Sequence, residues 1–198
     1  MARPKKSDKA KMATFKIENA FWKLLETESY SDITVLRICQ ESGINRNSFY
    51  YHYKDINDLA YTAFKSNASS DASEALLSAL FSQAWGNGER SMSSIDPSIL
   101  HHAKKIMLCA SSDSLFLNQL VRDLLKQSWF DALGIDEKLL NIIDELQIDF
   151  IFSGMSAVLG RAEISSSPFL MAELSRTEIG QSAFAVMKTI SDRQKSRT

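Results

Sequence analysis

The sequence predicts an all-α protein, because three of its properties favour helices. Glycine and proline, which break helices, number only 7 and 3 among 198 residues. Apolar residues recur at three- and four-residue steps along most of the chain, as they do on the buried face of an amphipathic helix. Residues that favour helix caps stand between these periodic stretches. With 44% hydrophobic residues, the chain can also bury a sizeable core.

The N-terminal third predicts a basic arm, residues 1–8, followed by several short helices. The first helix is expected at about 9–27, where apolar residues fall on one face. Thr34 can cap a second helix through its side-chain oxygen. Gly43 can end that helix, because glycine adopts the left-handed conformation common at a helix C-terminus.

The second and third helices meet at a short turn, which predicts a helix-turn-helix unit. Asn45 can cap the third helix, and Phe49 and Tyr53 are four residues apart, so we expect both on its inner face. The second helix of such a unit enters the DNA major groove. The outward residues would offer donors, acceptors and flat apolar faces to phosphates and bases: Arg46, Asn47, Tyr50 and Tyr51. The alternative is a plain packing unit with a solvated, tyrosine-rich face.

The charge is distributed unevenly along the chain. Residues 1–54 hold 10 Lys and Arg against 6 Asp and Glu, whereas residues 55–198 hold 13 against 18. A basic end on an acidic body favours contact between that end and a polyanion such as DNA. Chance clustering explains a difference of this size equally well, so the charge supports the DNA interpretation without deciding it.

The segment "ITVLRICQESGINRNSFYYHYKDINDL", residues 33–59, resembles the helix-turn-helix of TetR-family transcriptional regulators, and residues 9–64 follow that pattern. The resemblance implies that the third helix reads an operator. It implies base-edge contacts for Arg46, Asn47 and Tyr51. It implies phosphate or backbone contacts for Thr34, Ser48, Tyr50 and His52. Asn45 and Lys54 complete the expected DNA-binding set. The family often has a lysine in the first turn of the fourth helix, where this chain has Ile56; Lys54 lies two residues earlier.

Residues 55–198 predict more helices and hold no comparable motif. Asp55 can cap a linking helix. Later helices are expected at about 71–85, 96–110, 114–133, 136–164 and 175–190. The stretch 136–164 is apolar on nearly all sides, so we expect it to be buried all round, either centrally or against a partner chain. Ser175 and Glu178 form a plausible capping box for the last helix, and residues 191–198 are expected in solvent.

The resemblance also implies a homodimer, in which the helices at 136–164 and 175–190 form a four-helix bundle with their copies. Ser153, Ala157 and Gly160 form a stripe of small residues that would let another helix come close. From the residues alone, packing against a helix of the same chain is about equally plausible, and the resemblance favours the dimer.

A ligand cavity between helices is a further expectation. Its candidate lining residues are large and apolar: Trp85, Met107, Phe116, Trp129 and Phe150. Most such residues are ordinary core in helical proteins. Because no cluster of like charges stands among these helices, we expect a small hydrophobic ligand.

Several function classes are disfavoured by what the sequence lacks. It has no glycine-rich phosphate loop, nucleophile elbow or zinc signature, so we expect neither an enzyme nor a cofactor or metal site. It shows no secretory signal and no apolar stretch long enough to span a bilayer. The two cysteines, Cys39 and Cys109, are expected as core residues, and we expect a cytoplasmic protein.

Together these observations predict an N-terminal three-helix DNA-binding domain, residues 1–54, and a C-terminal helical regulatory and dimerisation domain, residues 55–198. The predicted function is a transcriptional regulator on a near-palindromic DNA operator, most simply a repressor released by a small hydrophobic ligand. The alternative is a DNA-binding co-regulator or activator controlled by a protein partner, without a small-molecule ligand. A closed apolar cavity would favour the first reading, and an exposed apolar patch the second.

Overall fold

The computed structural model describes residues 6–68, 97–167 and 169–196. Within these ranges every regular element is a helix and no strand is present, which confirms the all-α prediction. The predicted helix at 71–85 lies outside the described residues. The α-helices are α1 (Lys6–Leu25), α2 (Val35–Ser42), α3 (Arg46–His52), α4 (Ile56–Ala68), α6 (Pro97–Ser111), α7 (Leu115–Leu133), α8 (Ile142–Leu159), α9 (Ala162–Ser166), α10 (Phe169–Arg176) and α11 (Glu178–Lys195). Two short 3₁₀ helices are η1 (Tyr30–Asp32) and η3 (Glu137–Leu139).

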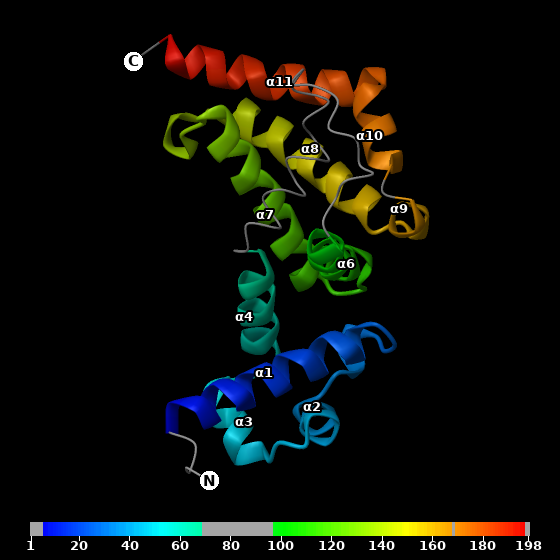
Figure 1. Ribbon diagram of the computed structural model, residues 1–198. Helices are drawn as coiled ribbons and strands as arrows, with labels where there is room; N and C mark the ends of the chain where they lie inside the picture. Colours follow the sequence, from blue (N-terminus) through cyan, green and yellow to red (C-terminus); the bar gives the residue numbers. More distant parts are fainter. Residues whose placement is uncertain (1–5, 69–96, 168, 197–198) are drawn as a thin grey trace.

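The helices are arranged along one long direction. In Figure 1, α1, α2 and α3 lie together at one end of the molecule, and α4 leads away from them. Helices α6 and α7 follow in the middle, and α8 and α11 lie at the far end. Below, α1–α3 are called the three-helix unit, and α6–α11 are called the body.

The ends of the early helices are fixed by the residues that the sequence indicates. The side chains of Thr34, Asn45 and Asp55 each accept a hydrogen bond from the backbone N–H three residues further on, at 3.3, 2.8 and 2.8 Å. Gly43 and Gly134 end α2 and α7 with φ of 67° and 68°, in the left-handed region that glycine adopts without a steric penalty.

The stretch predicted as one helix over 136–164 is divided into three, so that prediction was wrong. It contains η3, then α8, then α9. A capping box starts α8: the Asn141 side chain accepts from the Asp144 N–H, and the Asp144 carboxylate accepts from the Asn141 N–H, both at 3.0 Å. This pair satisfies backbone donors that a continuous helix would have satisfied itself, and so α8 begins at Ile142.

The start of the last helix was also predicted wrongly. Ser175 lies inside α10 and is buried, and the N-cap of α11 is Thr177, whose hydroxyl oxygen accepts from the Gly180 N–H at 3.5 Å. The two helices approach so closely that a Cβ at Gly180 would lie 2.4 Å from the backbone oxygen of Leu174. We attribute the position of this cap to the close contact between α10 and α11, and the local sequence pattern does not predict such a contact.

Helix α11 runs to Lys195, and the expectation of a solvated segment from residue 191 was wrong. Ser191 and Gln194 are buried. The Ser191 hydroxyl donates to the Leu133 carbonyl at 2.6 Å. The Gln194 amide accepts from the Asp136 N–H at 2.8 Å and donates to the Asp136 carbonyl at 3.0 Å. Polar side chains at the end of α11 thus hold the corner between α7 and α8.

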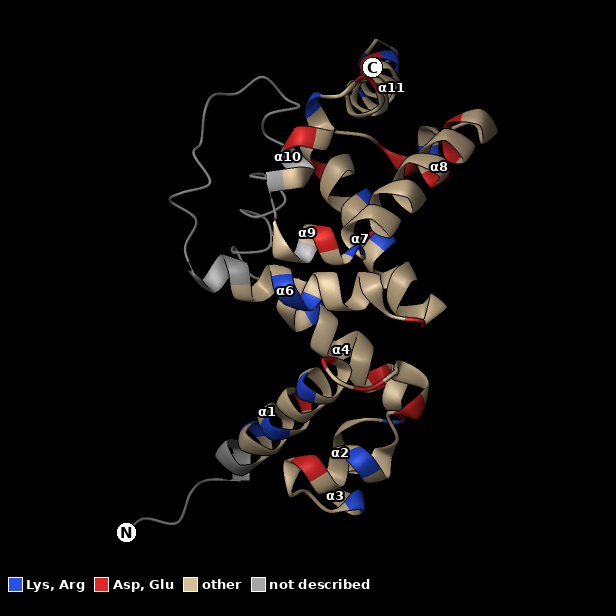
Figure 2. Cartoon of the chain, turned by 90° about the vertical axis from the view of Figure 1, so that its right-hand side faces the viewer, with Lys and Arg blue, Asp and Glu red and all other residues tan. Residues whose placement is uncertain are grey.

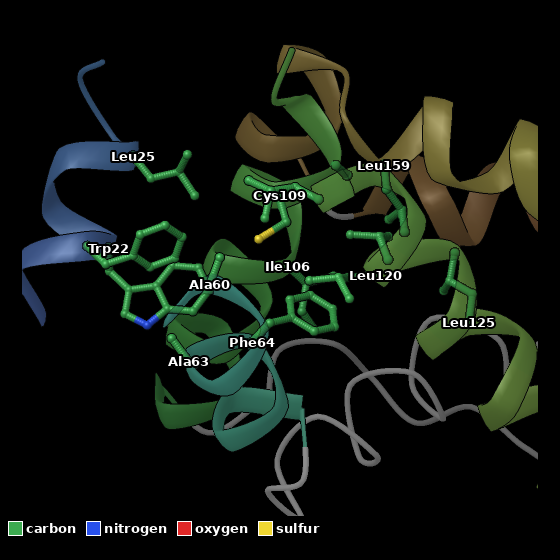
Figure 3. Close-up of a cluster of buried hydrophobic side chains, with 14 of the residues drawn as sticks. Trp22, Leu25, Ala60, Ala63, Phe64, Ile106, Cys109, Leu120, Leu125 and Leu159 are labelled. Atoms are coloured by element: carbon green, nitrogen blue, oxygen red, sulfur yellow. The ribbon is translucent and has the colours of Figure 1, made fainter. Parts of the chain in front are cut away.

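One core continues from the three-helix unit into the body. Figure 3 shows α1 side chains beside side chains of α4 and α6, with those of α7 beyond them. The participating residues are fully or almost fully buried: Trp22, Leu25, Ala60, Ala63, Phe64, Ile106, Cys109, Leu120 and Leu125. Because these contacts cross between the two parts, α4 and α6 hold the three-helix unit against the body.

A polar pair joins α4 to α6 within this apolar junction. The Asn67 side chain is buried, and its amide nitrogen donates to the His102 carbonyl at 3.2 Å. Its amide oxygen lies 2.7 Å from His102 Nδ1. Because the amide nitrogen is committed to the carbonyl, the oxygen is the acceptor and Nδ1 carries the proton. Both polar ends of Asn67 are thus bonded to one residue of α6.

The His102 environment predicts a pH dependence of folding stability. Burial, followed by the charges of Lys105 and His101, lowers the pKa of His102. The unfolded chain therefore takes up this proton at a higher pH than the folded chain does. The contribution of neutral His102 to stability is fully present above about pH 6.5 and decreases as the pH falls below it.

We expect thermal unfolding between about pH 5 and pH 8 to show this loss in the parent protein and to show less of it in His102→Gln, which has no proton to gain. His101→Gln is the control, because the His101 side chain is exposed. This variant should retain most of the pH dependence of thermal unfolding seen in the parent. Equal pH dependence in the parent and in His102→Gln would contradict the interpretation.

Gly154 of α8 and Gly160, which directly follows that helix, form a matched pair for testing helix packing. A Cβ at Gly160 would lie 2.4 Å from the backbone oxygen of Ala110 on α6, whereas one at Gly154 has no described atom within 4 Å. Gly160→Ala should therefore lower the free energy of unfolding by about 1–3 kcal/mol, because backbone has to move. Gly154→Ala should leave it unchanged or raise it by up to about 1 kcal/mol.

Urea unfolding at several protein concentrations would measure both effects, and concentration dependence would reveal any contribution from self-association. Equal midpoints for the two variants would show that Gly160 is not held against α6.

Candidate nucleic-acid interface

Helix α3 is anchored by two aromatic side chains on its inner face, as predicted. Phe49 is fully buried, and Tyr53 directly follows the helix and is only 4% exposed. Their ring centroids lie 5.7 Å apart. The Tyr53 hydroxyl donates to the Glu18 carboxylate of α1 at 2.9 Å. This anchoring fixes which face of α3 points outward.

The outward face of α3 consists of large polar and aromatic side chains. Tyr51 is 74% exposed and Tyr50 is 53% exposed, and Arg46 and Asn47 are exposed as well. Within the described parts of the chain, none of these four side chains makes a hydrogen bond. Their donors and acceptors are therefore free to bind a partner molecule.

The two exposed tyrosines are oriented by neighbouring rings. Tyr50 meets the buried Phe49 edge-on, with ring centroids 5.5 Å apart and planes at 88°. Tyr51 meets the half-buried His52 in the same way, at 4.9 Å and 88°. Such edge-to-face contacts limit ring rotation. The face presents aromatic surfaces in defined directions, which suits stacking on or packing against flat groups.

The remaining candidate contact residues have mixed roles. Thr34 and Asn45 use their side-chain oxygens as helix caps, which leaves the Thr34 hydroxyl proton and the Asn45 amide nitrogen as donors. Ser48 is half-buried on α3, whereas Lys54 is exposed and lies just after the end of that helix. The Lys54 backbone N–H donates to the Asp58 carboxylate at 2.9 Å, which fixes the chain where α3 passes into α4.

Two cations of the three-helix unit are paired with carboxylates. Lys23 of α1 bonds to Glu41 of α2, and Arg37 of α2 bonds to Glu28 in the segment that follows α1. The Arg37 hydrogen bond lowers the pKa of Glu28. Both pairs are at least partly exposed, so they contribute little to stability, and their main effect is to neutralise charge.

The cations at the two ends of α3 have no such partner. Arg46 begins the helix and Lys54 follows it, and neither forms an ion pair with any described residue. Figure 2 shows Lys and Arg segments on each of α1, α2 and α3. Lys23 and Arg37 are neutralised, whereas Arg46 and Lys54 leave unpaired positive charge at the two ends of α3. This distribution favours an anionic partner there.

The aromatic residues proposed for a ligand cavity are not brought together. Trp129 is 3% exposed and packs edge-on against Phe152 and Phe184, at 5.9 and 6.2 Å between centroids. Phe150 is 79% exposed on another side of α8. Met107 and Phe116 pack against the core and are half-buried. Trp85 lies outside the described residues.

A hollow of about 330 Å³ lies between α4 and α7. It has an apolar base and a partly charged lining: Tyr61, Phe64, Lys65, Ala68, Leu120, Asp123, Leu124 and Gln127. The sequence does not predict this hollow, because helical periodicity shows that each helix has an apolar face but not which two faces meet.

An apolar groove of about 350 Å³ lies between α8 and α11. It is lined by Ile143, Leu146, Gln147, Phe150 and Ile151 of α8 and by Ile179, Ser182, Ala183 and Val186 of α11. Ser153 and Ala157 are exposed and continue the α8 side of this groove at helical spacing. Gly160 instead faces Ala110 of α6, so the close approach that it allows is used within the chain. Apolar residues recur at helical steps at positions 179, 183 and 186, and this pattern could have predicted the α11 side of the groove.

The cysteines of the body and the three-helix unit are both buried. Burial raises the pKa of the Cys109 thiol to about 12, so this thiol is protonated and unreactive at neutral pH. No described helix combines the length and the hydropathy that crossing a bilayer requires.

A scan against protein-family models found no match to this chain. A search of curated proteins also found no match. Among solved structures, the chain is similar to one described as a gamma-butyrolactone receptor (ArpA-like protein). The two are 13% identical with a TM-score of 0.41, and the alignment covers 96% of this chain and 99% of that chain.

Proposed function

We propose that this protein is a sequence-specific DNA-binding regulator of transcription. The observation that carries the proposal is the outward face of α3, where unbonded donors and exposed aromatic rings stand on a firmly anchored short helix beside unpaired positive charge. A helix-turn-helix places its second helix in the major groove, which admits one α-helix. The resemblance of residues 33–59 to TetR-family regulators supports the same assignment.

The side chains of α3 divide into base-reading and positioning groups. Arg46 and Asn47 have the two-pronged geometry that suits guanine and adenine edges, and Tyr51 offers an apolar ring edge to a thymine methyl. The hydroxyl, amide, imidazole and ammonium groups around them can donate to phosphate oxygens, and such contacts fix the register of the helix on DNA. These positioning residues are Thr34, Asn45, Ser48, Tyr50, His52 and Lys54.

The groove between α8 and α11 supports assembly of two copies. Phe150 and Ile179 are 79% and 68% exposed, in a groove lined almost wholly by apolar atoms. Large apolar patches are rare on monomers and mark interfaces. Two such helix pairs, facing each other, would bury both grooves in a four-helix bundle. A twofold dimer would then require a near-palindromic operator.

Control by a small hydrophobic ligand, with release of a repressor from its operator, is the regulatory part of the proposal. The hollow between α4 and α7 supports it, because α4 leads directly from α3 into the body. Control by a protein partner is the alternative, and the apolar groove between α8 and α11 would favour it if that groove did not bind a second copy.

Substitutions on α3 should separate base reading from positioning. Asn47→Ala should relax sequence preference at one base pair by about 1–3 kcal/mol. Tyr50→Phe should weaken binding to all sequences alike and leave the slope of the salt dependence unchanged, because it removes one neutral hydrogen bond to a phosphate and no positive charge. Ser166→Ala is the control: it removes an exposed hydroxyl from α9 of the body and should leave both the affinity and the sequence preference unchanged.

The measurement is selection of binding sites from a random DNA pool, followed by titrations at several salt concentrations. If the parent protein selects no sequence, or if Asn47→Ala selects the parent's site unchanged, α3 does not read DNA in this way.

Charge introduced into the α8–α11 groove should break the dimer. Phe150→Glu and Ala157→Glu would each bury a carboxylate without a partner in the two-copy assembly. Leu115→Glu is the control, because Leu115 is 84% exposed at the start of α7, outside the groove. Sedimentation should give a dimer for the parent and the control, and a monomer for both groove variants. A dimeric Phe150→Glu would place the interface elsewhere.

A further inference from the structure

Glu18 of α1 lies between α3 and the body. On one side its carboxylate accepts the Tyr53 hydroxyl hydrogen bond at 2.9 Å. Tyr53 is almost fully buried, and its N–H donates to the Phe49 carbonyl at 2.9 Å, which closes the last turn of α3. A hydrogen bond to an ionised carboxylate is stronger than a neutral one. The position of the end of α3 therefore depends on where Glu18 holds the hydroxyl.

A lysine of the body, Lys105 of α6, lies against the same face of α1 as Glu18. The Lys105 ammonium of α6 lies 5.2 Å from the centroid of the Trp22 ring. Trp22 follows Glu18 by one helical turn, so both face the same part of α6. Burial lowers the pKa of Lys105, and the negative charge of Glu18 opposes this by raising it. The ammonium is therefore held against α1 by an aromatic ring, and the carboxylate one turn earlier on that helix adds an attractive charge.

We infer that Glu18 is a positioning residue, through which Lys105 of α6 and Tyr53 at the end of α3 act on each other and which holds α3 in its reading orientation. This inference rests on the proposed DNA-binding function of α3. The route passes through α1 and does not use the covalent connection through α4. Movement of α6 would then reach α3 through a charge and one hydrogen bond.

A neighbouring ion pair provides a contrast. Lys104, next to Lys105 on α6, bonds to Glu26 near the end of α1 at 2.8 Å. Both partners are exposed, and exposed pairs of this kind contribute little. Within the described residues, Glu26 makes no hydrogen bond or ion pair with α3, whereas Glu18 bonds to Tyr53 directly. Two adjacent lysines of α6 thus lie against α1: Lys104 pairs with Glu26, and Lys105 lies over Trp22, one helical turn from Glu18.

The test is a double-mutant cycle on the full-length protein. Lys105→Gln removes the charge, and Tyr53→Phe removes only the hydroxyl. Affinity is measured for a DNA fragment that the parent protein has selected. We expect each single variant to bind this DNA at least about threefold more weakly than the parent. The double variant should bind at least about threefold more tightly than the product of the two single losses predicts. Lys104→Gln combined with Tyr53→Phe should show no such coupling.

Two further variants separate positioning from general stability. Glu18→Gln keeps an acceptor for Tyr53 but loses the charge, so Lys105→Gln should cause no additional loss in that background. Lys105→Arg keeps the charge and should restore binding to the parent level. Independent losses for Lys105 and Tyr53, or equal coupling for the Lys104 control, would overturn the inference.

A readout without DNA distinguishes failure of the inference from failure of the proposed function. In Lys105→Gln, the amide protons of α3 should exchange at least about threefold faster than in the parent, while those of α7 remain unchanged. This result supports the route even if the protein selects no DNA. Unchanged exchange in α3 would contradict the route even if DNA binding is confirmed.

Discussion

A helix of seven residues cannot form alone in water, because its few hydrogen bonds do not offset the cost of starting it. Helix α3 therefore depends on the burial of Phe49 and Tyr53 beneath α1. The same burial decides which residues point outward, since successive side chains are spaced by a fixed angle around the helix axis. The exposed arginine, asparagine and tyrosines form one face because two aromatic anchors occupy the other. The chemistry of the surface is thus a consequence of the packing beneath it.

The elements that the sequence predicts well are those encoded locally. Caps at Thr34 and Asn45 and the inward pair of aromatic residues follow from helical geometry and could be predicted from the residues alone. The divided helix after Gly134 was missed because the capping box at Asn141 competes with a long apolar run, and periodicity gives no measure of that competition. The cap of α11 was missed because close contact with α10 selects it. Hollows between helices, and Glu18 as a link, depend on which faces meet, and that is a tertiary property.

Helix α8 serves two environments at once. Ile148 and Phe152 fill the core of the body, whereas Leu146 and Phe150 line the groove with α11. A sequence that is apolar on nearly all sides is therefore explained by one face that the chain covers itself and another that it leaves open. Gly160, directly after α8, belongs to the covered side, because its lack of a side chain lets α6 of the same chain approach closely.

The hydrogen bonds of Ser191 and Gln194 have a consequence for the order in which the protein is made. Each satisfies backbone groups that precede it by 58 positions. The contacts within α1–α3 span far shorter separations, and local contacts form sooner than distant ones. During synthesis the N-terminal helices can fold as soon as they leave the ribosome. The corner between α7 and α8 keeps these backbone groups without their partners until much later, so a nascent chain would carry its three-helix unit before it has a finished body.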